Sequence, residues 1–245
     1  MRIGVLSDIH GNLEALQACL ALLEQKGAET YIQCGDIIGY GPDGEACVRQ
    51  VMQLPLLASV MGNHDAILAF PTIGNLFNFD AKLALEESVP GLSKTSADFL
   101  RTLPSSASGD NFTVLHGTPL DPIKEYFHSK EQFNMYYQMW QGQVLFVGHT
   151  HLPFYIKGSV RTCHMYLNQR ENHTIDLQDK CRYVINPGAV GKPRDHNPHA
   201  ACGLWDTQEK TFTFLRTEYD LETTQEKMRA QNYPSFLVES LAYGL

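Results

Sequence analysis

Apolar residues cluster in short runs along the first two thirds of the chain, and each run is followed at once by polar residues. These runs are Ile3–Leu6, Tyr31–Cys34, Leu56–Met61, Phe112–Leu115 and Val144–Val147. Short apolar runs bounded by turn residues are typical of strands buried in a sheet. We therefore expect five strands whose ends carry polar side chains. If these strands end side by side, the polar groups meet at one edge of a sheet.

Helical periodicity follows the first two runs. Asn12 is placed to cap a helix and Gly27 to end it, and between them apolar residues recur at helical spacing, at Leu13, Leu16, Leu20 and Leu23. The free N–H groups at the start of this helix could favour a bound phosphate. A second helical pattern follows the turn-rich sequence GYGPDG, at Cys47, Val51 and Leu54. Two strand–helix units in succession predict parallel strands joined by crossover helices.

The rest of the chain predicts a second, more antiparallel part. Helices are expected around 81–88 and 93–103, and a last helix at about 221–231. Strands are expected at 154–157, 160–166, 182–185, 201–206 and 211–217, with hairpin turns such as KGS at 157–159. Two mixed sheets packed face to face, with helices outside, would account for this order of elements. No internal repeat or long linker divides the 245 residues, so we predict a single domain, 1–245.

Composition and charge narrow the function classes. The hydrophobic fraction of 43% is ordinary for a globular chain, and the sequence has neither an apolar run of membrane-spanning length nor a secretory leader. The net charge of −8 disfavours general binding to nucleic acid but leaves room for a small phosphorylated substrate. The six cysteines form no CxxC pair, which favours a reduced, cytoplasmic protein. The sequence leaves the oligomeric state open, a homo-oligomer included.

Seven of the polar residues that follow the strands are potential metal ligands: Asp8, His10, Asp36, Asn63, His116, His149 and His151. In an extended segment, residues i and i+2 point to the same face, so the first two and the last two can each aim into one pocket. Glycine stands close to every one of these motifs, where the backbone would turn sharply or approach a ligand.

The chemistry of this set predicts a two-metal hydrolytic site. Nitrogen and oxygen ligands without thiolate suit Mn²⁺, which we expect, or Fe, Zn, Ni or Co. Seven ligands exceed one tetrahedral ion but divide evenly between two divalent ions if Asp36 bridges them. Two ions roughly 3.5–4 Å apart can lower the pKa of water and clamp the attacking and leaving oxygens of a phosphoryl transfer. The expected reaction is phosphoester hydrolysis by a metal-bound hydroxide.

The motifs DIH, GDIIG, GNHD, HG and GHTH, in this order between positions 8 and 151, resemble the calcineurin-like metallophosphoesterase superfamily. The later sequence INPGAVGKPRDHNPHA (185–200) resembles its compact prokaryotic phosphodiesterase-type branch, so the resemblance covers nearly the whole chain. It implies an α/β fold, a four-layer α-β-β-α sandwich of two mixed sheets.

The resemblance also implies roles for individual residues. It assigns one metal to Asp8, His10, Asp36 and His151, and the other to Asp36, Asn63, His116 and His149. His64 matches the catalytic histidine, which would contact the phosphate and protonate the leaving oxygen. Asp65 would orient neighbouring groups. Asn12 matches a position close to the phosphate.

Simpler interpretations remain open for several residues. Asp36 could cap a turn instead of bridging two metals. Arg194 could bind a substrate phosphate through two hydrogen bonds or form a surface salt bridge. Lone histidines are usually structural, which we expect for His128, His164, His173, His196 and His199.

Aromatic residues are dense in the middle of the chain, at Tyr126, Phe127, Phe133, Tyr136, Tyr137 and Trp140, with Phe70, Phe77 and Phe79 earlier. We predict a helical and aromatic cap formed by parts of 66–110 and 118–140. The rings could stack on a nucleobase, form the core of that cap or make a dimer contact; we favour packing.

The sequence thus predicts a phosphodiesterase or phosphatase acting on a small phosphorylated molecule, a nucleotide among the candidates. A protein phosphatase is an alternative, but that branch carries GDxVDRG, whereas this chain has GDIIGYG and lacks the phosphate-gripping arginine. A nuclease is disfavoured by the acidic balance. A non-catalytic scaffold on the same fold is the alternative from another class, and the presence of His64 with all seven ligands argues against it.

Overall fold

Each of the five early apolar runs forms a strand in the computed structural model, which describes residues 1–77, 79–160, 162–167 and 172–245. The strands are β1 (Arg2–Leu6), β2 (Thr30–Gln33), β3 (Leu56–Ser59), β4 (Ser106–Ser108), β5 (Phe112–Leu115), β6 (Val144–Phe146), β7 (Phe154–Gly158), β8 (Cys163–Leu167), β9 (His173–Asp176), β10 (Arg182–Asn186), β11 (Ala200–Asp206) and β12 (Thr211–Thr217). The helices are α1 (Leu13–Gln25), α2 (Gly44–Gln53), α3 (Asn63–Ala66), α4 (Phe79–Ser88), α5 (Lys94–Thr102), α6 (Lys130–Tyr136), α7 (Leu221–Ala230) and α8 (Ser235–Tyr243), with a 3₁₀ helix, η1 (Pro71–Leu76).

The described strands form two six-stranded mixed sheets, in the orders β3-β2-β1-β11-β12-β9 and β4-β5-β6-β10-β7-β8. In the first sheet β1, β2 and β3 are parallel, and in the second β5, β6 and β10 are parallel. The remaining neighbours are antiparallel, as the hairpins expected in the second half require. The parallel strands lie towards one end of the first sheet's order and in the middle of the second's.

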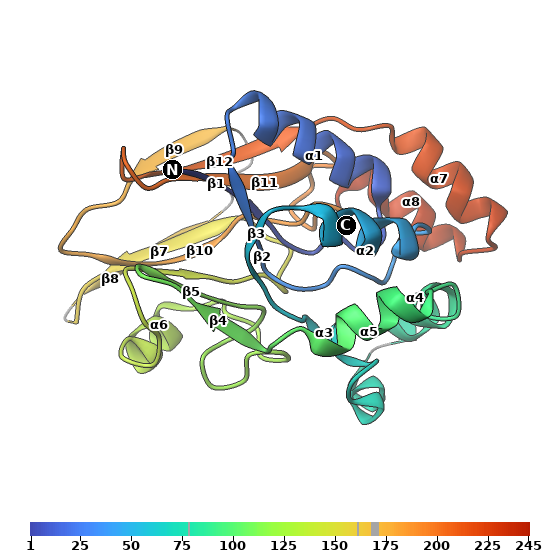
Figure 1. The fold of residues 1–245 in the computed structure, drawn as a ribbon, viewed down its shortest axis with the longest axis horizontal. Coiled ribbons are helices and arrows are strands. Elements are labelled where there is room, and N and C mark those ends of the chain that lie inside the picture. Colours follow the sequence, from blue (N-terminus) through green and yellow to red (C-terminus); the bar gives the residue numbers. More distant parts are fainter. Residues whose placement is uncertain (78, 161, 168–171) are drawn as a thin grey trace.

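The core has three layers of apolar side chains, one between the sheets and one on each outer face. Between the sheets, Val5 and Trp205 of the first meet Phe146 of the second. Helices α1 and α2 cover the outer face of the first sheet, and α6 covers that of the second through Phe133. Figure 1 shows α1 and α6 on opposite sides of the two sheets. The predicted four-layer α-β-β-α sandwich is confirmed.

Local signals explain why these elements start and stop where they do. The Asn12 side chain accepts a hydrogen bond from the Ala15 N–H, 3.1 Å away, and so caps α1 as its position predicted. Apolar residues on one side of α1 pack onto the sheet, among them Leu16, Leu20 and Leu23. Within the part of the chain that the structure describes, no helix combines the length and apolar character needed to cross a bilayer.

Several elements were not expected individually from the sequence, among them β4, β9 and α8. Strand β4 has only small residues, and β9 alternates one buried residue, Ile175, with exposed ones. Helix α8 carries its buried residues, Leu237, Val238 and Leu241, over fewer than three turns after Pro234. The strand predicted at 160–166 begins later, at Cys163, and Arg161 within that range lies outside the described residues.

Candidate metal centre

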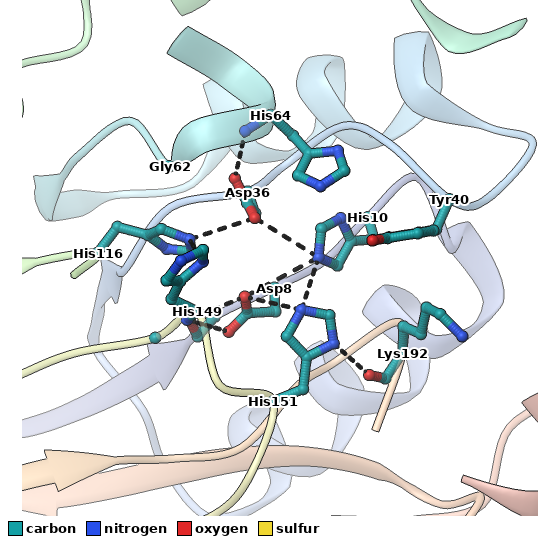
Figure 2. Close-up of polar contacts among 12 residues, drawn as sticks. Asp8, His10, Asp36, Tyr40, Gly62, His64, His116, His149, His151 and Lys192 are labelled. Carbon is teal, nitrogen blue, oxygen red and sulfur yellow. Dashed lines mark hydrogen bonds and ion pairs between the residues drawn. The ribbon is translucent and has the colours of Figure 1, made fainter. Parts of the chain in front are cut away.

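All seven predicted ligands come together in a buried cluster beyond the carboxyl ends of parallel strands from both sheets. Asp8 and His10 follow β1, Asp36 follows β2, Asn63 begins α3 after β3, His116 follows β5, and His149 and His151 follow β6. None is more than 8% exposed. Figure 2 shows the aspartates and histidines of this set pointing toward one another. The two sheets thus contribute to one polar site at a shared edge, as the strand-end positions indicated.

The backbone at five of these ligands is not extended, which corrects the expectation of extended segments at the two ligand pairs. Asp8, His10, Asp36, His149 and His151 have φ values of 52°, 49°, 59°, 68° and 59°. The left-handed region costs a residue with a side chain about 1–3 kcal/mol, and such strain gathers at functional sites. Each pair therefore converges because the chain turns at both ligands, and not because the segment is a regular strand.

Hydrogen bonds between the loops hold this strained backbone in place. The N–H groups of Asp8 and His10 donate to Gly35 O and Asp36 O, at 3.1 and 3.0 Å, so the loops after β1 and β2 run together. The His149 N–H donates to the Asp8 carboxylate at 3.1 Å, joining the two sheets. Gly62 lies so close to Asp36 that a Cβ would meet Oδ1 at 2.1 Å. Only glycine fits there.

One nitrogen of each ligand imidazole is fixed by a backbone carbonyl. His10, His116 and His151 donate from Nδ1 to Ile38 O, Cys34 O and Lys192 O, at 3.1, 2.8 and 2.6 Å. His149 uses the other nitrogen, with Nε2 3.0 Å from Lys124 O. A carbonyl only accepts, so the proton of each neutral ring lies on the bonded nitrogen and the other nitrogen keeps its lone pair. Such backbone partners orient metal-binding histidines.

The remaining nitrogens face one another in two pairs. His10 Nε2 lies 3.1 Å from His151 Nε2, and His116 Nε2 lies 3.1 Å from His149 Nδ1. Where both nitrogens of a pair are unprotonated, their lone pairs repel at this distance, and a cation between them would turn the repulsion into coordination. The residues therefore fit metal ions, and the groups that can hold one include Asp8 with the first pair and Asp36 with the second.

Asp36 lies between the two pairs. Its Oδ2 is 3.6 Å from His10 Nε2 and 3.2 Å from His116 Nε2. Its Oδ1 accepts the His64 N–H at 2.8 Å. The Asn63 carbonyl oxygen lies 3.2 Å from His116 Nε2, and Asp8 Oδ1 lies 3.4 Å from His151 Nε2. Every predicted ligand thus has an oxygen or nitrogen at one of the two pairs.

Burial shifts the pKa values of the proposed ligands toward their uncharged forms. It lowers the pKa of His149 to about 3 and those of His10 and His151 well below the usual value, so these imidazoles are neutral. Burial raises the pKa of Asp8 to about 6, and the charge of Asp36 adds to that effect. Burial opposes the charged form of His116 too, but Asp36 raises its pKa to about 9. A proton and a metal ion therefore compete for His116 Nε2.

His64 and Asp65, predicted as catalytic and orienting residues, lie directly beside the cluster. His64 is 3% exposed, burial lowers its pKa to about 4, and its buried Nδ1 has no hydrogen-bond partner among the described residues. Asp65 accepts from the N–H groups of Ile37, Ile38 and Gly62 at 2.9–3.2 Å. Burial raises the pKa of Asp65 to about 7, with Asp36 adding to the shift. Asp65 thus fixes the backbone that follows Asp36 and the backbone that precedes Asn63.

A pocket of about 320 Å³ opens beside the cluster and contains residues that the sequence did not single out as site residues. Tyr40, Ile73, Phe77, Lys124 and Tyr126 line it, together with Asp36, Asn63, His64, His149, His151 and Arg194. The Tyr126 ring stacks on His149 with centroids 3.8 Å apart, and Phe77 stacks on His64 at 5.2 Å. Aromatic density in 66–140 was the available signal, but nothing in the sequence indicated which rings reach the pocket.

The structure agrees with some of the remaining expectations for the pocket and the aromatic residues, and differs from others. Arg194 lines the pocket, whereas Asn12 does not; its amide donates to Gly191 O at 3.0 Å and its oxygen caps α1. Phe127, Phe133, Tyr136 and Trp140 pack into the core over the second sheet, the packing role that we favoured. The groups of possible metal ligands among the described residues exclude the histidines expected to be structural: His128, His164, His173, His196 and His199.

The chain is similar to known proteins along nearly its whole length. The sequence profile of the Calcineurin-like phosphoesterase superfamily domain matches residues 1–210. An uncharacterised protein of Methanocaldococcus jannaschii is 32% identical over 250 residues, which cover 99% of this chain and 98% of the relative. A metallophosphoesterase from Sphaerobacter thermophilus has a TM-score of 0.88 at 33% identity, covering 100% and 99% of the two chains. A protein from Pyrococcus horikoshii OT3 shares the fold, with a TM-score of 0.76 at 19% identity over 100% and 98%.

Proposed function

This chain belongs to the calcineurin-like phosphoesterase superfamily and is a metal-dependent phosphoric ester hydrolase, and from that premise we propose that it uses two divalent metal ions to hydrolyse a small phosphorylated molecule. The substrate is a phosphodiester or a phosphorylated nucleotide. The observation that carries the proposal is the presence of two pairs of imidazole nitrogens, one on each side of Asp36. The two nitrogens of each pair are 3.1 Å apart.

We assign Asp8, His10, Asp36 and His151 to one ion and Asp36, Asn63, His116 and His149 to the other. When bound, the ions would act as Lewis acids that lower the pKa of water and stabilise negative charge on the phosphoryl oxygens. We expect Mn²⁺, with Fe, Zn, Ni or Co as alternatives, because imidazole and carboxylate ligands suit all of these. Asp36 is the natural shared ligand since its Oδ2 lies within 3.6 Å of a nitrogen from each pair.

The surrounding residues bind the substrate and move a proton. His64 lines the pocket and would contact the phosphate, whose negative charge favours the protonated imidazole and so the transfer of a proton to the leaving oxygen. Arg194, which also lines the pocket, would bind phosphate oxygens. Asp65 holds the backbone beside Asp36, and Asn12 shapes the loop at Gly191. The cap predicted at 66–110 and 118–140 would frame the entrance through Phe77 and Tyr126.

The alternatives are less well supported. A protein phosphatase of this superfamily would carry an arginine that grips phosphate after Asp36, whereas this chain has GDIIGYG. The pocket of about 320 Å³ has the size expected for a small ligand. A non-catalytic scaffold would not need His64 and both nitrogen pairs. We keep the cytoplasmic location as a proposal, with the six free cysteines in its favour.

Turnover of bis(p-nitrophenyl) phosphate with and without Mn²⁺, and with a chelator, tests the function. We expect Mn²⁺-dependent release of p-nitrophenol that the chelator abolishes. On a diester with a basic alkoxide leaving group, His64→Ala should lower turnover by at least about 100-fold, since a proton donor contributes about 10²–10⁴-fold. The loss on the p-nitrophenyl ester should be smaller, because p-nitrophenoxide leaves without a proton. A metal-loaded protein that hydrolyses neither this diester nor a panel of nucleotides would contradict the proposal. Full activity of His64→Ala on the alkoxide diester would remove the assigned role of that residue.

A further inference from the structure

Tyr40 occupies a backbone position that a bulky residue seldom adopts. Its φ is 44°, in the left-handed region, and it stands between Gly39 and Gly41. Both glycines are needed for close packing, because a Cβ on Gly39 would meet His64 Nδ1 at 2.3 Å and one on Gly41 would meet His10 O at 2.5 Å. The turn is thus pressed between the candidate catalytic histidine and a candidate metal ligand. Strain of this kind points to a specific use of the side chain.

The Tyr40 ring contacts both neighbours. It lies edge-on to His10 with centroids 4.8 Å apart and tilted against His64 at 4.9 Å. It is 6% exposed and also packs on α7 and α8 through Met228 and Leu237. Figure 2 shows Tyr40 beside His10, on the side of the cluster where Lys192 lies. The ring is therefore held firmly from several directions, and its hydroxyl has a defined place.

The hydroxyl of Tyr40 accepts a hydrogen bond from Arg194 Nη2 at 3.2 Å, and the guanidinium lies 5.6 Å from the ring centroid. The adjacent carboxylate, Asp195, pairs instead with the buried Arg216. A guanidinium has five N–H donors, so one hydrogen bond to Tyr40 leaves others for a ligand in the pocket. The lining of that pocket includes two cations, Arg194 and Lys124, against the single carboxylate of Asp36.

We propose that Tyr40 is a positioning residue that holds Arg194 over the pocket, and that this pair favours a substrate with a doubly charged terminal phosphoryl group over a singly charged diester. The proposal deepens and rests on the phosphoesterase function proposed above. Its physical basis is that the attraction of a fixed guanidinium doubles when the phosphoryl group carries two charges instead of one. The fork of N–H groups also matches two oxygens of a terminal phosphate.

Two esters with the same leaving group differ in charge: p-nitrophenyl phosphate is a dianion at pH 8, and bis(p-nitrophenyl) phosphate is a monoanion. Comparing their rates therefore tests the effect of substrate charge with the leaving group held constant. For Arg194→Ala we expect kcat/KM to fall by about 10- to 100-fold on the monoester, as for a lost charge-assisted hydrogen bond, and several-fold less on the diester. Tyr40→Phe, which removes only the hydroxyl, should raise KM for the monoester by about three- to tenfold with kcat nearly unchanged. The double variant should lose no more than Arg194→Ala alone.

Calorimetric binding of inorganic phosphate to the Mn²⁺-loaded protein gives a readout that does not depend on turnover. Phosphate affinity should fall in both variants and should not recover in Arg194→Lys, which keeps the charge but loses the fork. Arg49→Ala and Tyr166→Phe, both at exposed positions, are matched controls, and melting temperatures check that each variant folds.

Equal losses on the two esters, unchanged phosphate affinity in Arg194→Ala, or additive effects of Tyr40→Phe and Arg194→Ala would overturn the proposal. If the wild-type protein hydrolyses neither these esters nor nucleotides, the proposed function fails. The phosphate titration still decides whether the Tyr40–Arg194 pair binds a phosphoryl group.

Discussion

Replacing Asp65 by asparagine should weaken metal binding although Asp65 is not itself a proposed ligand. Its carboxylate accepts from the N–H groups of Ile37 and Ile38, which follow Asp36, and of Gly62, which precedes Asn63. Asparagine has nearly the same shape but one acceptor oxygen in place of two. Its NH₂ group would face at least one of these N–H groups, donor against donor.

The magnitude follows from that lost acceptor. One buried N–H left without a partner costs about 1–3 kcal/mol. Part of this cost is offset, because burial disfavours the charged form of Asp65, as its raised pKa shows, and the uncharged amide removes that buried charge. We expect the free energy of unfolding to fall by about 1–2 kcal/mol. Metal affinity should fall by about 10- to 100-fold, as is typical when a residue that orients metal ligands is changed.

Calorimetric titration of metal-stripped protein with Mn²⁺ measures the affinity, and urea unfolding of the same samples measures stability. Asp110→Asn, at an exposed aspartate, is the matched control and should leave both unchanged. If Asp65→Asn binds Mn²⁺ as tightly as the wild type, the backbone beside Asp36 does not depend on Asp65, and the account of how the ligands are held is wrong.

Three further substitutions test the local geometry. Gly62→Ala should abolish Mn²⁺-dependent turnover, because its Cβ would meet Asp36 Oδ1 at 2.1 Å. Gly44→Ala, at the start of α2, is the control, because its Cβ would meet its nearest neighbour at 3.6 Å. This variant should keep its activity and gain up to about 1 kcal/mol in stability. Turnover and melting temperatures compare the two, and equal effects would refute the packing argument. Asn12→Ala should cost about 1–2 kcal/mol in urea unfolding through the lost α1 cap, with KM nearly unchanged. A large rise in KM with unchanged stability would instead make Asn12 a substrate contact.

The positions of the proposed ligands could be predicted because the ligands follow closely after apolar strand segments in the sequence. Val5 and Leu6 end a buried strand and Asp8 follows at once; Phe146 and His149 repeat the arrangement in the second sheet. Parallel strands then bring such residues to one edge whatever the details of the loops.

The conformation of those loops could not be predicted. Alternation suggested extended backbone for His149 and His151, but both have positive φ, which is set by contacts with Asp8 and Lys192 from distant parts of the chain. The same holds for the aromatic contacts. Tyr126 is one ring among many in the sequence, and only the folded chain stacks it on His149.

The central claim is that seven residues hold two metal ions that share Asp36, and counting Mn²⁺ ions bound per chain tests it most directly. Titration of the metal-stripped wild type should give two ions per chain, His151→Ala should retain one tight site, and Asp36→Asn should weaken both. A wild type that binds a single ion, or an Asp36→Asn variant that loses one site and keeps the other intact, would contradict the shared centre.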